Sequence, residues 1–256
     1  MRPPVCSVAD AVATVGDGDC VYLGNFGAQL FAVADELITQ RRRELHAVVA
    51  SGGLLLDRLI GAGVLARATY AHCWSPVGPD PAWHFRRLAQ AGDRRVVRHE
   101  VSLGMLSAAL TAAAWRVPFL PIPAPAGTGY LTEDWPNGMV TTVDTPFGSA
   151  PVVRALAPDV AFVHVDLADE WGNGVIRSPV GEALVAAQAA RRVVLVAEEL
   201  ADHDRVRAAG ITIPGVLVAM VVHHPGAVAP DGAIGRYPRD VPAYQRLVRQ
   251  AAEAGP

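Results

Sequence analysis

The fold is decided by Asp17-Gly18-Asp19-Cys20-Val21-Tyr22-Leu23-Gly24-Asn25-Phe26-Gly27, a strand signal that runs directly into a glycine-rich turn. The apolar run at residues 20–23 predicts a first β-strand, and residues 24–27 predict a tight turn after it. Apolar side chains then recur at steps of three and four between Leu30 and Ile38, which predicts a helix that continues to about Arg42. This order is typical of a strand-helix-strand unit in a parallel sheet.

The same alternation of strand and helix signals continues to the end of the chain. Because a chain of 256 residues can form one large α/β domain, residues 1–256 are predicted to be a single domain with an open, mostly parallel sheet flanked by helices. Further strands are predicted at residues 46–50, 67–72, 95–99, 160–165 and 192–197, and further helices at 53–59, 83–91, 105–115, 181–190 and 241–252.

Proline and glycine mark the segments that interrupt this alternation. Residues 73–81 are predicted to be an ordered loop. Residues 118–128 contain four prolines and are predicted to form an extended, rigid connection, because prolines cannot supply consecutive N–H groups to a sheet. Residues 134–145 are predicted to be a loop with a hairpin edge, and residues 175–176 a short strand.

Three consecutive cations, Arg41, Arg42 and Arg43, fall where the first predicted helix ends. Cations in a last helical turn interact favourably with the negative end of the helix dipole. We therefore expect them to close this helix, with an anion site as the alternative.

The charge composition excludes several classes of function. All 22 basic residues are arginine, against 25 acidic residues, for a formal charge of −3. This balance argues against nucleic-acid binding driven by bulk positive charge. The lack of lysine excludes Schiff-base chemistry and a phosphate-binding loop that ends in Gly-Lys.

Cysteine usage and hydropathy point to a compartment. Cys6, Cys20 and Cys73 are odd in number and lack CxxC spacing, so neither a disulfide framework nor a zinc ribbon is predicted. No apolar stretch has the length of a signal peptide at the start of the chain, and none approaches the ~18 residues of a membrane span. We expect a cytoplasmic protein that does not act at a membrane.

Four features fall at the carboxyl ends of predicted strands, where open parallel sheets bind their ligands. They are residues 24–27, residues 51–53, Glu100 and residues 169–173. We expect them to lie along one edge of the sheet and to form the functional site.

The first glycine turn leaves three interpretations open. Gly24 and Gly27 follow a strand as in a dinucleotide-binding turn, but the third glycine of that motif is absent and the acid about 20 residues later, Glu44, precedes the second strand. A close approach of the backbone to a ligand and ordinary turn chemistry are the other two.

The second turn and Glu100 each allow a functional and a structural interpretation. Ser51, Gly52 and Gly53 present backbone N–H groups that can bind an anion or a thioester oxygen, and the G-x-S-x-G motif of serine hydrolases is absent. Glu100, shielded by Leu103 and Met105, is suited to proton transfer or, alternatively, to the N-terminus of the next helix. The histidines form no metal-ligand set, so no metal site is predicted.

The order of motifs resembles that of class I CoA-transferase α-type subunits, from about residue 8 to residue 250. No single motif is specific, but their order and spacing together are. The resemblance rests on residues 17–27, Ser51-Gly52-Gly53, Glu100 with Gly104-Met105, Ala112-Ala113-Ala114, residues 116–122, Asp169-x-x-Gly172-Asn173, residues 186–199, Pro214-Gly215, Pro225-Gly226-Ala227 and Tyr237-Pro238-x-Asp240.

This resemblance implies a CoA-transferase-like fold and one subunit of a heteromeric enzyme, αβ or α2β2, acting on a carboxylic acyl-CoA. The attacking glutamate would belong to the β-type partner, coenzyme A would enter as part of the substrate, and no cofactor would be tightly bound. Glu100 falls on the acid shared by the family and is the candidate catalytic residue. The candidate substrate-binding residues are Gly24, Asn25, Phe26, Gly27, Ser51, Gly52, Gly53, Gly127 and Asn173.

Two relatives of this superfamily have given up CoA transfer, one for ring-opening hydrolysis of a CoA thioester and one for decarboxylation of an acyl-CoA. The segment from Glu100 to Ile122 resembles their α-type subunits as closely as those of transferases. Transfer, hydrolysis and decarboxylation therefore stay open. A ligand-sensing α/β module and a nicotinamide-dependent oxidoreductase are the alternatives outside the superfamily.

Overall fold

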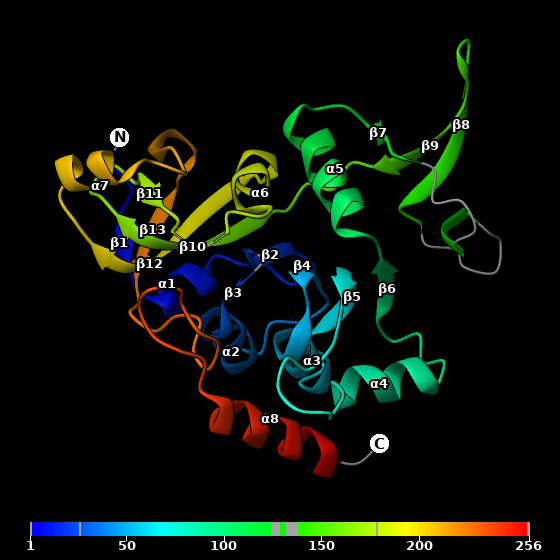
Figure 1. Cartoon of the computed structure of the whole chain (residues 1–256), viewed down its shortest axis with the longest axis horizontal. Coiled ribbons are helices and arrows are strands. Elements are labelled where there is room, and N and C mark those ends of the chain that lie inside the picture. The colour runs from blue at the N-terminus through cyan, green and yellow to red at the C-terminus, as the bar shows by residue number, and fades with distance from the viewer. Residues whose placement is uncertain (1, 26, 124–128, 132–137, 178, 255–256) are drawn as a thin grey trace.

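The computed structural model describes residues 2–25, 27–123, 129–131, 138–177 and 179–254, and its centre is one open sheet (Figure 1). All neighbours along the main path of this sheet are parallel, which confirms the predicted open, mostly parallel architecture. In spatial order the path contains β1 (Val5–Cys6), β13 (Met220–His223), β12 (Arg192–Leu200), β10 (Val160–Ala168), β2 (Cys20–Asn25), β4 (Leu45–Ser51), β5 (Leu65–His72) and β6 (Val97–Glu100). Two short strands, β3 (Ala28–Gln29) and β11 (Gly174–Val175), pair antiparallel with β2 and β10.

Helices cover both faces of the sheet. Because successive side chains of a strand point to opposite faces, Val21 and Leu23 pack on one layer of helices and Tyr22 on the other. The first layer contains α1 (Val8–Ala13), α2 (Phe31–Thr39), α3 (Gly53–Gly61), α4 (Trp83–Gln90) and α8 (Val241–Glu253). The second contains α5 (Leu103–Ala114) and α6 (Ala183–Ala189), and α7 (His203–Ala209) packs near β11.

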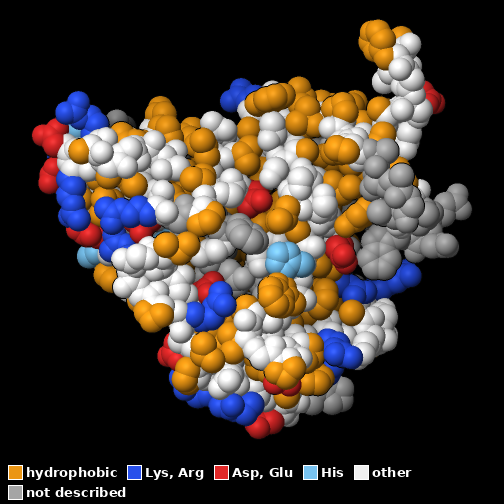
Figure 2. Space-filling model, viewed as in Figure 1, with side chains coloured by type: hydrophobic (Ala, Val, Ile, Leu, Met, Phe, Trp, Pro, Cys, Tyr) orange, Lys and Arg blue, Asp and Glu red, His pale blue; other side chains and the backbone are white. Residues whose placement is uncertain are grey.

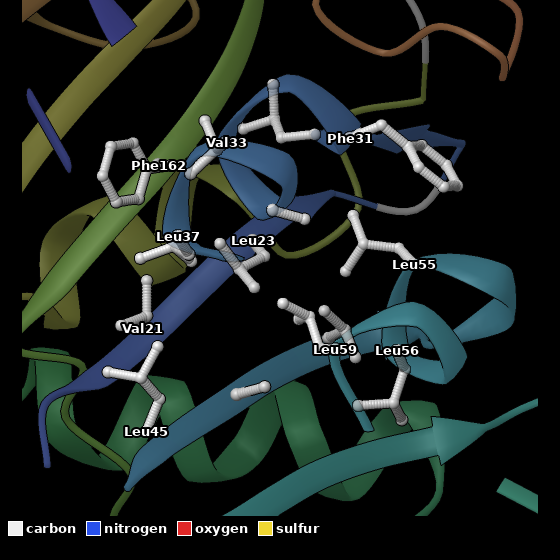
Figure 3. Packing of buried hydrophobic residues seen from close by; sticks show 14 of the residues in the cluster. Val21, Leu23, Phe31, Val33, Leu37, Leu45, Leu55, Leu56, Leu59 and Phe162 are labelled. Atoms are coloured by element: carbon white, nitrogen blue, oxygen red, sulfur yellow. The ribbon is translucent and has the colours of Figure 1, made fainter. Parts of the chain in front are cut away.

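The core between β2, α2 and α3 fixes the first glycine turn in place (Figure 3). Leu23 of β2 lies among Leu37 of α2 and Leu55 and Leu59 of α3, and all four side chains are buried. Since the turn follows Leu23 directly and α2 begins a few residues later, both ends of the turn are anchored in packed structure.

A second, three-stranded antiparallel sheet lies beside the main one, in the order β7 (Phe119–Pro121), β9 (Gly148–Arg154), β8 (Val140–Thr145). The predicted hairpin edge in residues 134–145 is β8. The prediction that residues 118–128 form only a connection is wrong, because β7 pairs with β9. An edge position needs no N–H from proline on its outer side, and the following residue, Ile122, donates its N–H to the carbonyl oxygen of Pro151.

The prediction for Arg41, Arg42 and Arg43 is also wrong. Helix α2 ends at Thr39, and Arg41 takes a left-handed backbone conformation with φ of 54°. The N–H groups of Arg41 and Arg42 then bond back to Ile38 and Leu37, so the cations lie beyond the helix. The guanidinium of Arg42 donates to the carbonyl oxygen of Ala13 and so ties this turn to α1.

Among the residues that the structure describes, no helix combines the length and the apolar character needed to cross a membrane.

Candidate active site

Three of the four predicted features lie along the carboxyl edge of neighbouring strands β2, β4, β5 and β6. Ser51 pairs with His72 across β4 and β5, and the register of β2 with β4 continues to place Asn25 opposite Ser51. Glu100 ends β6 opposite Tyr70, two residues before His72. With adjacent strands about 4.8 Å apart, the first turn and Glu100 are separated by three steps, or about 14 Å.

The first turn is shaped by its own chain. Strand β3 returns directly onto β2, pairing Gln29 with Gly24. Gly24 has φ of 91°, and a Cβ on it would lie 2.2 Å from the carbonyl oxygen of Ala28. Only glycine fits there, whereas Gly27 (φ 84°) is exposed and has no neighbour within 4 Å of such a Cβ. Phe26 lies outside the described residues.

Gln29 fastens the first turn to the second. Its Nε2 donates to the carbonyl oxygen of Ser51 at 2.8 Å, and its side chain is only 8% exposed. A Cβ on Gly53 would lie 2.8 Å from the same nitrogen, so the glycine at this position makes room for the amide. The sequence analysis missed Gln29, because its partner is 22 residues away and no local pattern indicates the contact.

Ser51 and His72 form a polar pair above this contact. The hydroxyl of Ser51 lies 2.9 Å from Nε2 of His72, and the His72 ring lies 6.3 Å from that of Trp74. Helix α3 begins immediately after, at Gly53, without a side-chain cap. Its first N–H groups therefore have no acceptor within the helix and face the same edge.

Glu100 lies at the other end of the site, partly buried beside two tyrosines. Burial, and then the negative charge of Glu100, raise the pKa of Tyr70 and of Tyr130 above their ordinary values. The expected shield is half present, since Met105 is buried but Leu103 is 40% exposed. The cap of α5 is Ser102, whose hydroxyl accepts the N–H of Met105, so the structural alternative for Glu100 is filled by another residue.

The fourth feature, residues 169–173, lies apart from the other three. Strand β10 passes the first turn near His164 and runs five more residues to Asp169, about 16 Å at 3.3 Å per residue. Asn173 uses both ends of its amide internally, since Nδ2 donates to Asp169 and Oδ1 accepts the N–H of Gly215. The last candidate, Gly127, lies outside the described residues.

A polar cluster that the sequence analysis missed lies next to the first turn, at the point where the strand order reverses between β2 and β10. Oε1 of Glu198 accepts from the hydroxyl of Tyr237 at 2.6 Å and lies 3.0 Å from Nε2 of His164, and Oε2 accepts the N–H of Gly226 at 2.7 Å. Burial raises the pKa of Glu198, but these hydrogen bonds outweigh it and lower the pKa to about 2. The carboxylate is therefore ionised at neutral pH.

This cluster holds a loop against the first turn. Tyr237 and its neighbour Arg236 belong to residues 231–239, and Arg236 bonds to the carboxylate of Asp166 at 3.1 Å. Together with Gly27, this loop lines an open hollow of about 600 Å³. Strand ends β10 and β12 thus position one wall beside the predicted substrate turn.

Two histidines near Glu100 face the opposite layer. Nε2 of His46 lies 2.8 Å from the hydroxyl of Thr69, and burial lowers the pKa of His46 to about 3 and that of His99 to about 4. Both rings are therefore neutral at pH 7. Within the described part of the chain, no group of three or more His, Cys, Asp or Glu is placed to hold a metal ion.

Fold and site together define an α/β enzyme subunit whose polar and glycine-rich strand ends share one edge. The coenzyme A transferase family model matches residues 5–224, so the chain belongs to the coenzyme A transferase family. This confirms the resemblance and the CoA-transferase-like fold, and the family acts on CoA thioesters.

Three relatives illustrate the range of this family. The chain is 31% identical to the α-type chain of 3-oxoadipate CoA-transferase from Pseudomonas knackmussii, over 90% of this chain and 82% of the relative. It is 30% identical to the cholesterol ring-cleaving hydrolase IpdA subunit of Mycobacterium tuberculosis, over 95% and 86%. The crystal structure of the decarboxylase AibA/AibB superposes with a TM-score of 0.86 at 31% identity, covering 98% of this chain and 95% of the other. These relatives confirm that the chain is an enzyme component of the α type.

We predict that Gly24→Ala destabilises the fold far more than Gly18→Ala. Both glycines have φ near 90°, at 91° and 84°, but only a Cβ on Gly24 meets a backbone oxygen. Gly18→Ala should cost about 1–2 kcal/mol of unfolding free energy from backbone conformation alone, and Gly24→Ala at least about 2 kcal/mol more. Urea unfolding measures both, and equal losses would contradict the account of the turn.

We predict that Glu198→Gln lowers the unfolding free energy at pH 7 by roughly 2–4 kcal/mol, because a buried, multiply bonded carboxylate is lost. The folded pKa lies below the ordinary value, so this stabilisation is present above about pH 4.5 and is lost as the pH falls towards 2. The difference between wild type and variant should shrink over that window. Glu199→Gln, at the exposed neighbouring position, is the control and should cost less than about 1 kcal/mol. A constant difference across the window would contradict the assignment.

Proposed function

We propose that this chain is the α-type subunit of an enzyme that transfers coenzyme A between carboxylic acids, and that it works with a β-type partner subunit. The observation that carries the proposal is the shared edge of the first turn, Ser51 and Glu100 on strands β2, β4 and β6, in a chain of the coenzyme A transferase family. CoA enters as part of the substrate, with no tightly bound cofactor. Free thiols at Cys6, Cys20 and Cys73 support a reducing, cytoplasmic setting.

Backbone groups of the two turns bind the acyl end of the substrate. The uncapped N-terminus of α3, which begins at Gly53, offers N–H groups and the positive end of the helix dipole to an acyl oxygen. Gln29 holds the two turns in register, so the donors are fixed before the substrate arrives. Donors of this kind contribute about 3 kcal/mol each to stabilising a developing oxyanion.

Transfer itself needs a nucleophile from the partner. A carboxylate of the β-type partner attacks the thioester carbonyl, the C–S bond breaks, and CoA leaves as a thiolate that later attacks the resulting anhydride. This chain positions the acyl group during both steps. Glu100, beside Tyr70 and Tyr130, acts as the acid/base or polar positioning group at the far end of the site.

Hydrolysis or decarboxylation of a CoA thioester is the second candidate function. It is favoured by the 30% identity to the ring-cleaving hydrolase and the 31% identity to the decarboxylase. Incubating the αβ complex with an acyl-CoA and an acceptor carboxylate separates these reactions. Transfer yields a new acyl-CoA in proportion to the acceptor, whereas hydrolysis or decarboxylation proceeds without it.

We predict that Glu100→Gln in the reconstituted complex lowers kcat/KM by a factor of about 10² to 10⁴, the usual contribution of a general acid or base. Assembly should be unchanged, because Gln is isosteric and the carboxylate is only partly buried. Steady-state kinetics together with sedimentation measure both properties.

Glu253→Gln, an exposed acid in the last turn of α8, is the matched control and should leave turnover at the wild-type level. Wild-type turnover in Glu100→Gln would refute the role of Glu100. It would leave membership of the family untouched.

A further inference from the structure

We propose that the β8–β9 hairpin is an arm that docks onto the β-type partner subunit. Strand β7 pairs with β9 only from Val152 to Arg154. The four pairs from Thr142–Pro151 to Thr145–Gly148 therefore form a two-stranded ribbon beyond the three-stranded sheet. Figure 1 shows this ribbon projecting away from the rest of the molecule.

The tip of the arm presents a large apolar side chain in a fixed turn. Phe147 is 100% exposed, and Figure 2 shows hydrophobic atoms at the end of the projecting ribbon. The hydroxyl of Thr145 donates to the carbonyl oxygen of Gly148 at 2.7 Å and accepts the N–H of Phe147 at 3.1 Å. The turn is therefore bonded within itself, and the phenyl ring is held out towards solvent.

The ribbon lacks the features that protect a free hairpin. Residues 140–151 contain one charged side chain, Asp144, and no arginine. Strand β8 forms the outer edge of the described sheet, and edge strands are normally blunted by charge or covered. Because a two-stranded hairpin alone is marginally stable in water, this composition indicates that another surface covers it.

The root of the arm identifies its occupant. The N–H of Arg154 donates to the carbonyl oxygen of Met139, and a Cβ on the preceding Gly138 would lie 3.6 Å from Nε2 of His99. The arm thus starts beside the strand that ends in Glu100. A partner that completes the site at this edge lies within reach of the arm, so the β-type partner is the occupant. This step rests on the proposed function.

The test is Phe147→Asp in this chain, co-expressed with the β-type subunit from the same genome. A buried aromatic anchor is a typical interface hot spot, so the αβ dissociation constant should rise at least about 30-fold. Val216→Asp is the matched control, because Val216 is 92% exposed in the turn η2 (Gly215–Leu217), outside the arm, and should leave affinity unchanged. Phe147→Leu should retain most of the affinity, and circular dichroism of the isolated chains checks folding.

Two results would overturn the arm. In one, Phe147→Asp assembles with wild-type affinity. In the other, the isolated wild-type chain self-associates and Phe147→Asp abolishes only that, so the occupant is a second copy. Assembly is measured separately from turnover, and an intact complex without CoA transfer would contradict the proposed function alone.

Discussion

The structure depends on the burial of its parallel strands on both faces. All nine residues of β10 are buried, and β2 is packed between helices on either side. Such strands cannot slip by one residue without moving every side chain to the other face, so their register is strongly specified. The positions of Ser51, His72 and Glu100 at the carboxyl edge follow from that register rather than from local loop structure.

Two side-chain contacts turn this edge into a defined site. Gln29 joins the first turn to the carbonyl oxygen of Ser51, and Glu198 joins β12 to the loop that contains Gly226 and Tyr237. Each has a buried polar group with partners on another segment, and such groups are costly to leave unpaired. The turns are therefore set by the folded core, which is how a site gains precision from rigid elements.

Much of the main sheet could be predicted from the sequence, because its signals are local. The predicted strands at 46–50, 67–72, 160–165 and 192–197 and the helices at 53–59 and 241–252 agree with the structure to within a few residues. The three-stranded sheet was not predicted, since β7 and β9 pair over more than 30 residues and their prolines argue against strands. Arg41 misled for another reason, because a left-handed arginine has no sequence signature.

The site was predictable only where it follows strand ends. Glu100 and Ser51 could be placed at the edge by counting strands, whereas Gln29, His72 and Glu198 act through partners 21 to 39 residues away. Similar identities of 31% and 30%, to a transferase chain and to a hydrolase chain, indicate that the α-type chain carries what these reactions share. Fold alone does not fix chemistry. A chain that binds and orients an acyl group, with the attacking group on a partner, can serve transfer, hydrolysis or decarboxylation by changing that partner.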